Sequence, residues 1–186
     1  MVKAIENSKY RDNTVIIFTS DHGWQMGEKN YLFKNSPWEE SARIPLIFKL
    51  PNQEEGSEVD QPVSLIDIFP TLIDLCNLKG NYRKNVNGGD IGGFSLKPLL
   101  YDNGKWQGPD GALTLVGNNG HSKSENEQTY SYRTRQFRLI RYGNGKIELY
   151  DHYKDPYEWQ NIANDKKNKK LIQQLNNEMD NILINR

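Results

Sequence analysis

The sequence predicts an α/β fold in which parallel strands are followed by a small antiparallel sheet and a closing helix. Two apolar runs, residues 14–20 and 43–51, are rich in β-branched and aromatic residues, as is typical of strands covered on both faces of a parallel sheet. After residue 110 the pattern changes to shorter strand-forming runs. We therefore divide the chain into an α/β portion, 1–105, and an antiparallel subdomain with a terminal helix, 106–186.

The α/β portion contains two predicted helices. Residues 2–10 form a short amphipathic segment with Val2 and Ile5 facing inward. Residues 64–78 give the clearest helix, and Asp67 can cap it. Its apolar positions recur at helical spacing and predict one buried face, which comprises Phe69, Leu72, Ile73 and Cys76.

The antiparallel subdomain is predicted from three short runs at residues 111–117, 129–142 and 146–152. Gly143-Asn144-Gly145 supplies the turn between the last two runs. Asp155-Pro156-Tyr157-Glu158 has the composition of a helix start, with a capping aspartate and a glutamate three residues later. The closing helix is amphipathic, and its apolar stripe comprises Leu171, Ile172, Leu175, Met179, Ile182 and Leu183.

Composition excludes several classes of protein. Lys+Arg and Asp+Glu both number 24, so the net charge is zero and no nucleic-acid partner is expected. Cys76 is the single cysteine, which leaves no internal disulfide and no cysteine-based metal site. No apolar run is long enough for a membrane span, and the first residues lack the apolar core of a signal peptide.

Polar groups follow the first predicted strand directly. Asp21 and His22 lie at its carboxyl end, where α/β sheets bind ligands. A carboxylate and an imidazole can together ligate a divalent cation, and the presence of only three histidines disfavours an all-histidine zinc site. Lys34 could then neutralise an anion bound to that cation. The residues alone leave a second interpretation open, in which Asp-His-Gly is a turn with glycine at positive φ and Lys34 is a surface lysine.

A longer pattern surrounds these residues. The stretch "NTVIIFTSDHGWQMGEKNYLFKNSPWEESARIPLIF" resembles the second-half signature of the sulfatases, in the alkaline-phosphatase-like superfamily, and is similar to the iduronate-2-sulfatase and choline-sulfatase type. "QPVSLIDIFPTLIDL" and "YRTRQFRLIRYGNGKIELYDHYKDPYEWQNIA" extend the resemblance over most of the chain. The first signature falls on Ser20, Asp21, His22, Gly23, Gly27, Glu28, Lys34, Glu40, Arg43 and Pro45.

The resemblance implies the C-terminal part of a sulfatase fold and assigns roles to residues of the signature. Asp21 and His22 would complete a calcium site, and Lys34 would contact the sulfate as the catalytic cation. Glu40 and Arg43 would form a structural ion pair. The remaining aromatic and histidine residues are expected to pack or to lie on loops, namely Trp24, Tyr31, Trp38, the loop residue His121 and the structural His152.

Two departures from the family pattern matter. Lys29 stands where the family often has histidine, so a contact there is lost or replaced. The family's nucleophile, a formylglycine made from Cys or Ser in Cys/Ser-x-Pro/Ala-x-Arg, has no counterpart, because Cys76 is followed by Asn-Leu-Lys. The expected function is hydrolysis of carbohydrate sulfate esters together with an N-terminal half that supplies the nucleophile. The chain alone is expected to be inactive, and the family resemblance implies a periplasmic or secreted location.

Two alternatives remain open at this point. A phosphodiester or phosphonate monoester hydrolase of the same superfamily would hold manganese or zinc in place of calcium. A non-catalytic binding module would tolerate Asp21→Ala, and its contact face would comprise Tyr130, Tyr132, Phe137 and Tyr142.

Overall fold

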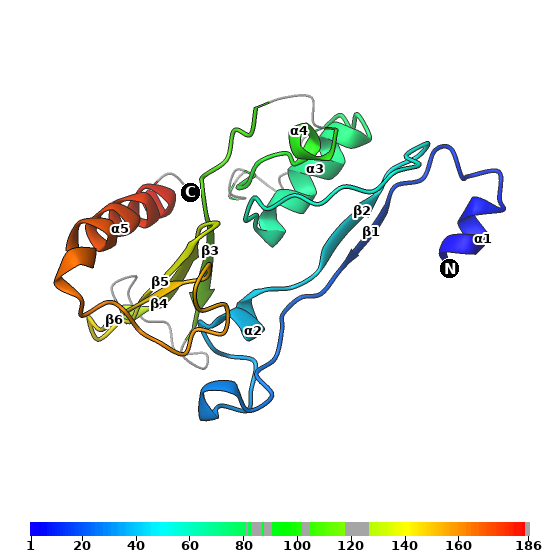
Figure 1. Ribbon diagram of the computed structural model, residues 1–186. Helices are drawn as coiled ribbons and strands as arrows, with labels where there is room; N and C mark the ends of the chain where they lie inside the picture. The colour runs from blue at the N-terminus through cyan, green and yellow to red at the C-terminus, as the bar shows by residue number, and fades with distance from the viewer. Residues whose placement is uncertain (81, 83–86, 88–90, 102–104, 118–126, 185–186) are drawn as a thin grey trace.

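The computed structural model describes residues 1–80, 82, 87, 91–101, 105–117 and 127–184. A four-stranded antiparallel sheet with helix α5 beside it forms one end of the molecule, and a long two-stranded ribbon leads away from it to helix α1 (Figure 1). Helices α3 and α4 lie between these parts. The predicted α/β class with an antiparallel sheet and a closing helix is confirmed.

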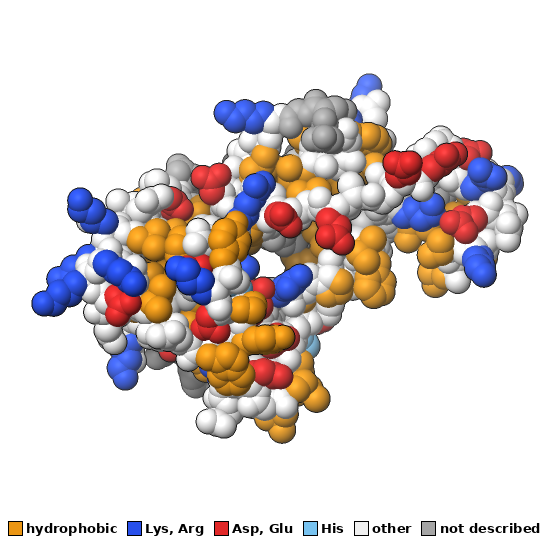
Figure 2. Space-filling view, in the orientation of Figure 1, with side chains coloured by type: hydrophobic (Ala, Val, Ile, Leu, Met, Phe, Trp, Pro, Cys, Tyr) orange, Lys and Arg blue, Asp and Glu red, His pale blue; other side chains and the backbone are white. Residues whose placement is uncertain are grey.

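The ribbon consists of β1 (Ile16–Thr19) and β2 (Leu46–Lys49), which pair antiparallel with Ile16 opposite Lys49. The prediction that these two runs are parallel strands is therefore wrong for this pair. A parallel pair needs a crossover that returns the chain to its starting end, whereas the segment between β1 and β2 simply reverses direction. The ribbon leaves Phe18 61% and Ile47 57% exposed, and hydrophobic side chains are visible along it in Figure 2.

The second sheet is an up-and-down meander in the order β3 (Ala112–Val116), β4 (Thr129–Arg133), β5 (Phe137–Arg141) and β6 (Ile147–Asp151). The predicted run 129–142 is thus a hairpin of two strands. The predicted turn before β6 is confirmed, because Gly145 has φ +81° and its N–H donates to the Tyr142 carbonyl at 2.9 Å.

The core lies between this sheet and α5 (Lys169–Ile184), which confirms the amphipathic closing helix. Leu139 and Met179 are fully buried there. Its buried members are Tyr130, Tyr132, Leu139, Leu149, Leu175 and Met179. Because Tyr130 and Tyr132 are core residues, the contact face suggested for a non-catalytic module does not exist as predicted.

The helices of the first portion are shorter than predicted. Helix α1 covers Val2–Glu6 and has no buried residue. The second prediction divides into a 3₁₀ turn, η2 (Leu65–Asp67), and α3 (Ile68–Leu75). The cap is a capping box in which the Ser64 N–H donates to Asp67 Oδ2 at 2.7 Å.

The predicted burial of Cys76 is wrong. Helix α3 ends at Leu75, and Cys76 follows it as an exposed residue. The buried position of α3 is Thr71, whose hydroxyl accepts a hydrogen bond from the Leu96 N–H just before α4 (Lys97–Leu100). The helix therefore packs through a polar anchor, and Phe69 on the predicted apolar face stays 45% exposed.

The predicted helix start at Asp155 is a turn instead. Asp155 does cap a backbone group, because its Oδ2 accepts from the Gln160 N–H at 2.7 Å. Glu158, however, takes a left-handed φ of +60° and is 1% exposed. That conformation ends any helix, and regular helix begins only with η4 (Lys166–Asn168) and α5. Within the described chain, no helix is both long and apolar enough to cross a membrane.

Candidate active site

The three residues predicted for catalysis and metal binding lie together beyond the end of β1. His22 Nε2 is 3.0 Å from Lys34 Nζ and 3.6 Å from Asp21 Oδ2. His22 Nδ1 is 2.8 Å from the Gly23 carbonyl, which can only accept, so Nδ1 carries a proton. In the neutral imidazole, Nε2 then has a lone pair directed at the Lys34 ammonium. The Asp21 side chain is 85% exposed.

The backbone after His22 is held by α2 (Glu39–Ala42). The Gly23 N–H donates to the Ser41 carbonyl at 2.9 Å, and the Trp24 N–H donates to the Glu40 carbonyl at 2.8 Å. A Cβ on Gly23 would lie 2.0 Å from the Glu40 carbonyl oxygen. Glycine is required here by close backbone approach, since Gly23 is not among the residues with positive φ, contrary to the turn interpretation.

The donor set fits part of a cation site. Calcium takes six to eight oxygen ligands. Asp21 offers an exposed carboxylate, and His22 offers the Nε2 lone pair, which a bound cation would take over from Lys34 Nζ. Within the described ranges, no third His, Cys, Asp or Glu side chain joins this pair. Asp21 and His22 therefore suit two positions of a site whose other ligands come from elsewhere.

The predicted ion pair of Arg43 has a different partner. Arg43 Nη1 lies 3.9 Å from Glu39 Oε1, and Glu40 is exposed. Arg43 follows α2 directly and lies one helical turn after Glu39, which explains why Glu39 and not its neighbour is reached.

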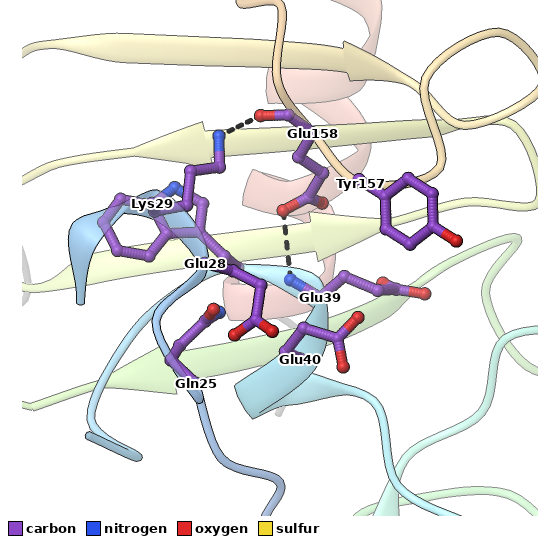
Figure 3. A pocket seen from close by; sticks show the side chains of 8 residues that line it. Gln25, Glu28, Lys29, Glu39, Glu40, Tyr157 and Glu158 are labelled. Atoms are coloured by element: carbon purple, nitrogen blue, oxygen red, sulfur yellow. Dashed lines mark hydrogen bonds between the residues drawn. The ribbon is translucent and has the colours of Figure 1, made fainter. Parts of the chain in front are cut away.

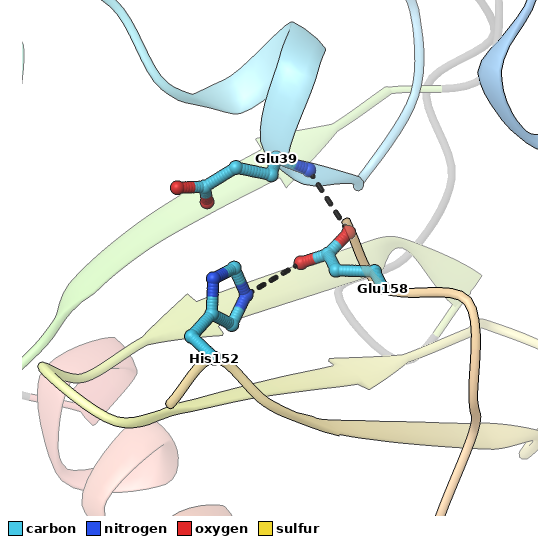
Figure 4. A group of neighbouring side chains, drawn as sticks. All are labelled: Glu39, His152 and Glu158. Carbon is cyan, nitrogen blue, oxygen red and sulfur yellow. Dashed lines mark hydrogen bonds and ion pairs between the residues drawn. The ribbon is translucent and has the colours of Figure 1, made fainter. Parts of the chain in front are cut away.

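Glu39 also belongs to a buried cluster of charges that the sequence did not reveal (Figure 4). Arg138 joins its two carboxylates: its Nε donates to Glu158 Oε1 at 2.5 Å, and its Nη2 donates to Glu39 Oε2. Arg133 Nε lies 3.4 Å from Glu39 Oε2, and His152 Nε2 lies 2.9 Å from Glu158 Oε1. Two guanidinium groups thus balance two carboxylates, and His152 is structural as predicted.

Glu39, His152 and Glu158 place possible ligand atoms within 4.8 Å of one another. A metal at this point would have to displace Arg138, which is 2% exposed and already bonded to both carboxylates. A buried guanidinium separated from both carboxylates would lose its charge partners, at a large free-energy cost. We therefore interpret this group as an ion-pair cluster.

The cluster shifts the pKa values of both glutamates. Burial alone would raise the pKa of Glu39, but Arg138 and Arg133 outweigh it and hold the pKa below its ordinary value of 4.5. Burial opposes ionisation of Glu158 as well, and the hydrogen bond from His152 together with the charge of Arg138 lowers its pKa below 4.5. Both side chains therefore stay ionised below the pH at which they would protonate in the unfolded chain.

This shift predicts acid sensitivity. The stabilisation is complete above about pH 4.5 and is lost as the pH falls through the lowered folded-state values, by about 1.4 kcal/mol per unit of pKa shift. Thermal unfolding between pH 3 and 7 should show the loss, and Glu158→Gln should flatten the curve. Glu55→Gln, at an exposed loop position, should leave the curve unchanged, and an equally steep curve for Glu158→Gln would contradict the assignment.

Lys29 contacts the same cluster from the loop before Lys34 (Figure 3). Lys29 is the middle residue of the turn η1 (Glu28–Asn30). Its Nζ donates to the Tyr150 hydroxyl at 2.9 Å and to the Glu158 carbonyl. Burial lowers the pKa of Lys29. Lys29, which stands where the family often has histidine, thus contacts the C-terminal sheet. The cavity beside it has a volume of only about 10 Å³.

The aromatic residues near the site divide as follows. Trp38 packs as predicted, with its ring edge-on to Tyr31 at 5.9 Å and its Nε1 donating to Glu148 Oε2 at 3.0 Å. Trp24 is 41% exposed and lies edge-on to Phe33 at 5.4 Å. His121 lies outside the described residues.

Comparisons with known proteins agree on the family. Residues 27–185 match the family model described as N-sulphoglucosamine sulphohydrolase, C-terminal. A sulfatase of Formosa agariphila is 34% identical over 94% of this chain and 31% of its own length. The N-acetylglucosamine-6-O-sulfatase of Bacteroides thetaiotaomicron is 32% identical over 88% of this chain and 30% of its own length.

One solved structure of high similarity is the phosphonate monoester hydrolase of Agrobacterium radiobacter, with a TM-score of 0.81 and 26% identity over 98% of this chain and 37% of that chain. The chain spans about a third of the length of the curated relatives it matches. The family match covers most of the chain, including the loop with Lys34 and the whole antiparallel sheet. This chain belongs to the sulfatases, in the C-terminal family of the N-sulphoglucosamine sulphohydrolases.

Proposed function

We propose that this chain forms one side of the active site of an enzyme that hydrolyses sulfate esters of carbohydrates. The observation that carries the proposal is the grouping of Asp21, His22 and Lys34, with His22 Nε2 within 3.0 Å of Lys34 Nζ. The substrate class is supported by a relative that is named an N-acetylglucosamine-6-O-sulfatase. The nucleophile is expected from the remaining two-thirds of the length found in the relatives.

Each of the three residues has a definite task in this proposal. Asp21 and His22 would hold a calcium ion, which when bound would supply positive charge to the sulfate oxygens. Lys34 would place its ammonium against the ester oxygen and balance the negative charge that develops there. The Gly23 contact to α2 keeps the His22 backbone close to the helix and so limits its movement relative to Lys34.

The chain alone is expected to bind calcium weakly, with a dissociation constant on the order of 10⁻³ M or higher, because it offers two ligands of the six to eight that calcium takes. Terbium can report this binding, since the Trp24 ring lies 6.3 Å from the His22 ring and can sensitise its luminescence. Asp21→Asn should abolish the signal, and Asp12→Asn should preserve it. Micromolar affinity, or release of sulfate by the chain alone, would contradict this prediction.

The function itself is testable in a hybrid enzyme. Residues 1–186 would replace the matching third of the Formosa agariphila sulfatase, and sulfate release from a sulfated glucosamine would be measured with and without a calcium chelator. We expect turnover that the chelator abolishes. A folded hybrid that is inactive on sulfate esters would overturn the proposal.

A second candidate, a phosphonate monoester hydrolase, is favoured by the TM-score of 0.81 to an enzyme of that name. The same hybrid distinguishes it, because hydrolysis of a phosphonate monoester with bound manganese or zinc would support this candidate. Calcium content with preference for the sulfate ester would support the sulfatase.

A further inference from the structure

The two faces of the antiparallel sheet carry different kinds of side chain. Leu139 on β5 points to the core under α5, and Arg141 on the same face donates to Asp180 of α5 at 2.8 Å. Arg138 is next to Leu139 in the strand, so its side chain lies on the other face, where it is 2% exposed. This second face carries the ion cluster, so the sheet presents buried charge to the segment that follows Lys34.

That segment, Pro37–Glu39, is held through its backbone. The Glu39 N–H donates to Glu158 Oε2 at 3.0 Å (Figure 3). The Pro37 carbonyl accepts from the Ser131 hydroxyl at 2.7 Å and from Arg138 Nη1 at 3.4 Å. Arg138 Nη1 also donates to the Ser131 hydroxyl oxygen at 2.7 Å, so one guanidinium fixes both ends of this short segment.

Pro37–Glu39 in turn connects to both sides of the candidate active site. Lys34 lies three residues before Pro37, and its carbonyl accepts from the Ser36 N–H at 3.0 Å. Glu39 begins α2, whose Glu40 and Ser41 carbonyls hold the backbone that follows His22. The positions of the Lys34 ammonium and the His22 imidazole therefore depend on where α2 is anchored.

The backbone and the side chain of Glu158 are both constrained. It is a non-glycine residue at φ +60° with 1% exposure, a conformation that costs free energy and persists only where the surroundings fix it. Its carboxylate accepts from Arg138, His152 and the Glu39 N–H, while its carbonyl accepts from Lys29. Lys29 is on the loop between His22 and Lys34, so Glu158 contacts the middle of that loop through its carbonyl and the start of α2 through its carboxylate.

We propose that Arg138 and Glu158 are positioning residues for the active site. They anchor α2 and the loop from residue 22 to residue 34 on the C-terminal sheet, and thereby set the contact between Lys34 and His22. The catalytic importance of the contact between Lys34 and His22 rests on the proposed function. The geometry of the contact can be tested without substrate or metal.

The test is nuclear magnetic resonance of the chain labelled with ¹⁵N and ¹³C, well below its melting temperature. In the wild type, a cross-peak between the Lys34 side chain and the His22 ring and the ¹⁵N shift of a hydrogen-bonded Nε2 are expected. Glu158→Gln preserves the shape but removes the charge that Arg138 meets. We expect the cross-peak to weaken or vanish and the Nε2 resonance to move toward that of an unbonded imidazole.

Arg141→Lys is the matched control, because it alters a second arginine of β5 whose partner lies on α5. The His22 and Lys34 signals should not change in this variant. If Glu158→Gln does not fold, Ser131→Ala removes the hydroxyl that donates to the Pro37 carbonyl and accepts from Arg138, and it should move the signals in the same direction. The proposal is overturned if a folded Glu158→Gln or Ser131→Ala chain keeps the wild-type signals, or if Arg141→Lys changes them equally. Neither result depends on sulfatase activity, which the hybrid enzyme measures separately.

Discussion

Arg138→Met is expected to lower the free energy of unfolding by about 3–5 kcal/mol, the usual cost of removing one partner from a buried ion pair. The substitution leaves Glu39 and Glu158, which are 8% and 1% exposed, without their shared guanidinium. Arg133 can still reach Glu39, but Glu158 keeps only His152 and a backbone N–H. Urea unfolding followed by tryptophan fluorescence would measure the loss.

Arg135→Met is the control for that measurement. Arg135 precedes β5 on the same hairpin but is exposed, and it contacts Gln61 at 3.4 Å. Its replacement should change the free energy of unfolding by no more than about 0.5 kcal/mol. Equal effects of the two substitutions would mean that the cluster contributes no more than a surface arginine does.

Lys34→Ala is expected to lower turnover of the hybrid enzyme by about 100- to 1,000-fold, the range found when one group that stabilises transition-state charge is removed. Its ammonium lies 3.0 Å from His22 Nε2. Because the side chain is exposed, folding should be unaffected, so the loss should appear in the rate of sulfate release and not in the melting temperature.

Lys167→Ala serves as the control for Lys34, since Lys167 is 80% exposed and pairs with Asp165 in the segment just before α5. Its turnover should equal that of the unmodified hybrid. If Lys34→Ala keeps wild-type turnover, Lys34 has no catalytic role and the surface-lysine interpretation holds.

Much of the fold could be predicted because the signals are local. The meander follows from short β-branched runs and a glycine turn, and the closing helix follows from an apolar stripe in which Leu175 and Met179 are indeed buried. The grouping of Asp21, His22 and Lys34 was also predicted, because a strand end brings the first two together and the family signature supplied the third. Their chemical roles stay predictions.

The missed features depend on contacts between distant residues. Arg138 reaches Glu39 across 99 positions of sequence, and the Glu39 backbone reaches Glu158 across 119. Nothing local distinguishes Glu39 from Glu40 as the buried carboxylate, because only the orientation of α2 decides it. The same contact explains why the predicted helix start is a turn. The capping role of Asp155 follows from the local sequence. The left-handed conformation of Glu158 does not, because the contacts of its side chain are to distant residues.

The ribbon of β1 and β2 has a consequence for handling the protein. Each of its strands pairs on one side only within the described residues, so a row of backbone N–H and C=O groups is available along each outer edge. Such edges recruit strands from other molecules, and the cross-strand pair Phe18 and Ile47 adds exposed apolar side chains to one face of the ribbon. The chain in isolation should therefore self-associate as its concentration rises, and light scattering should be checked before any spectroscopic titration is interpreted.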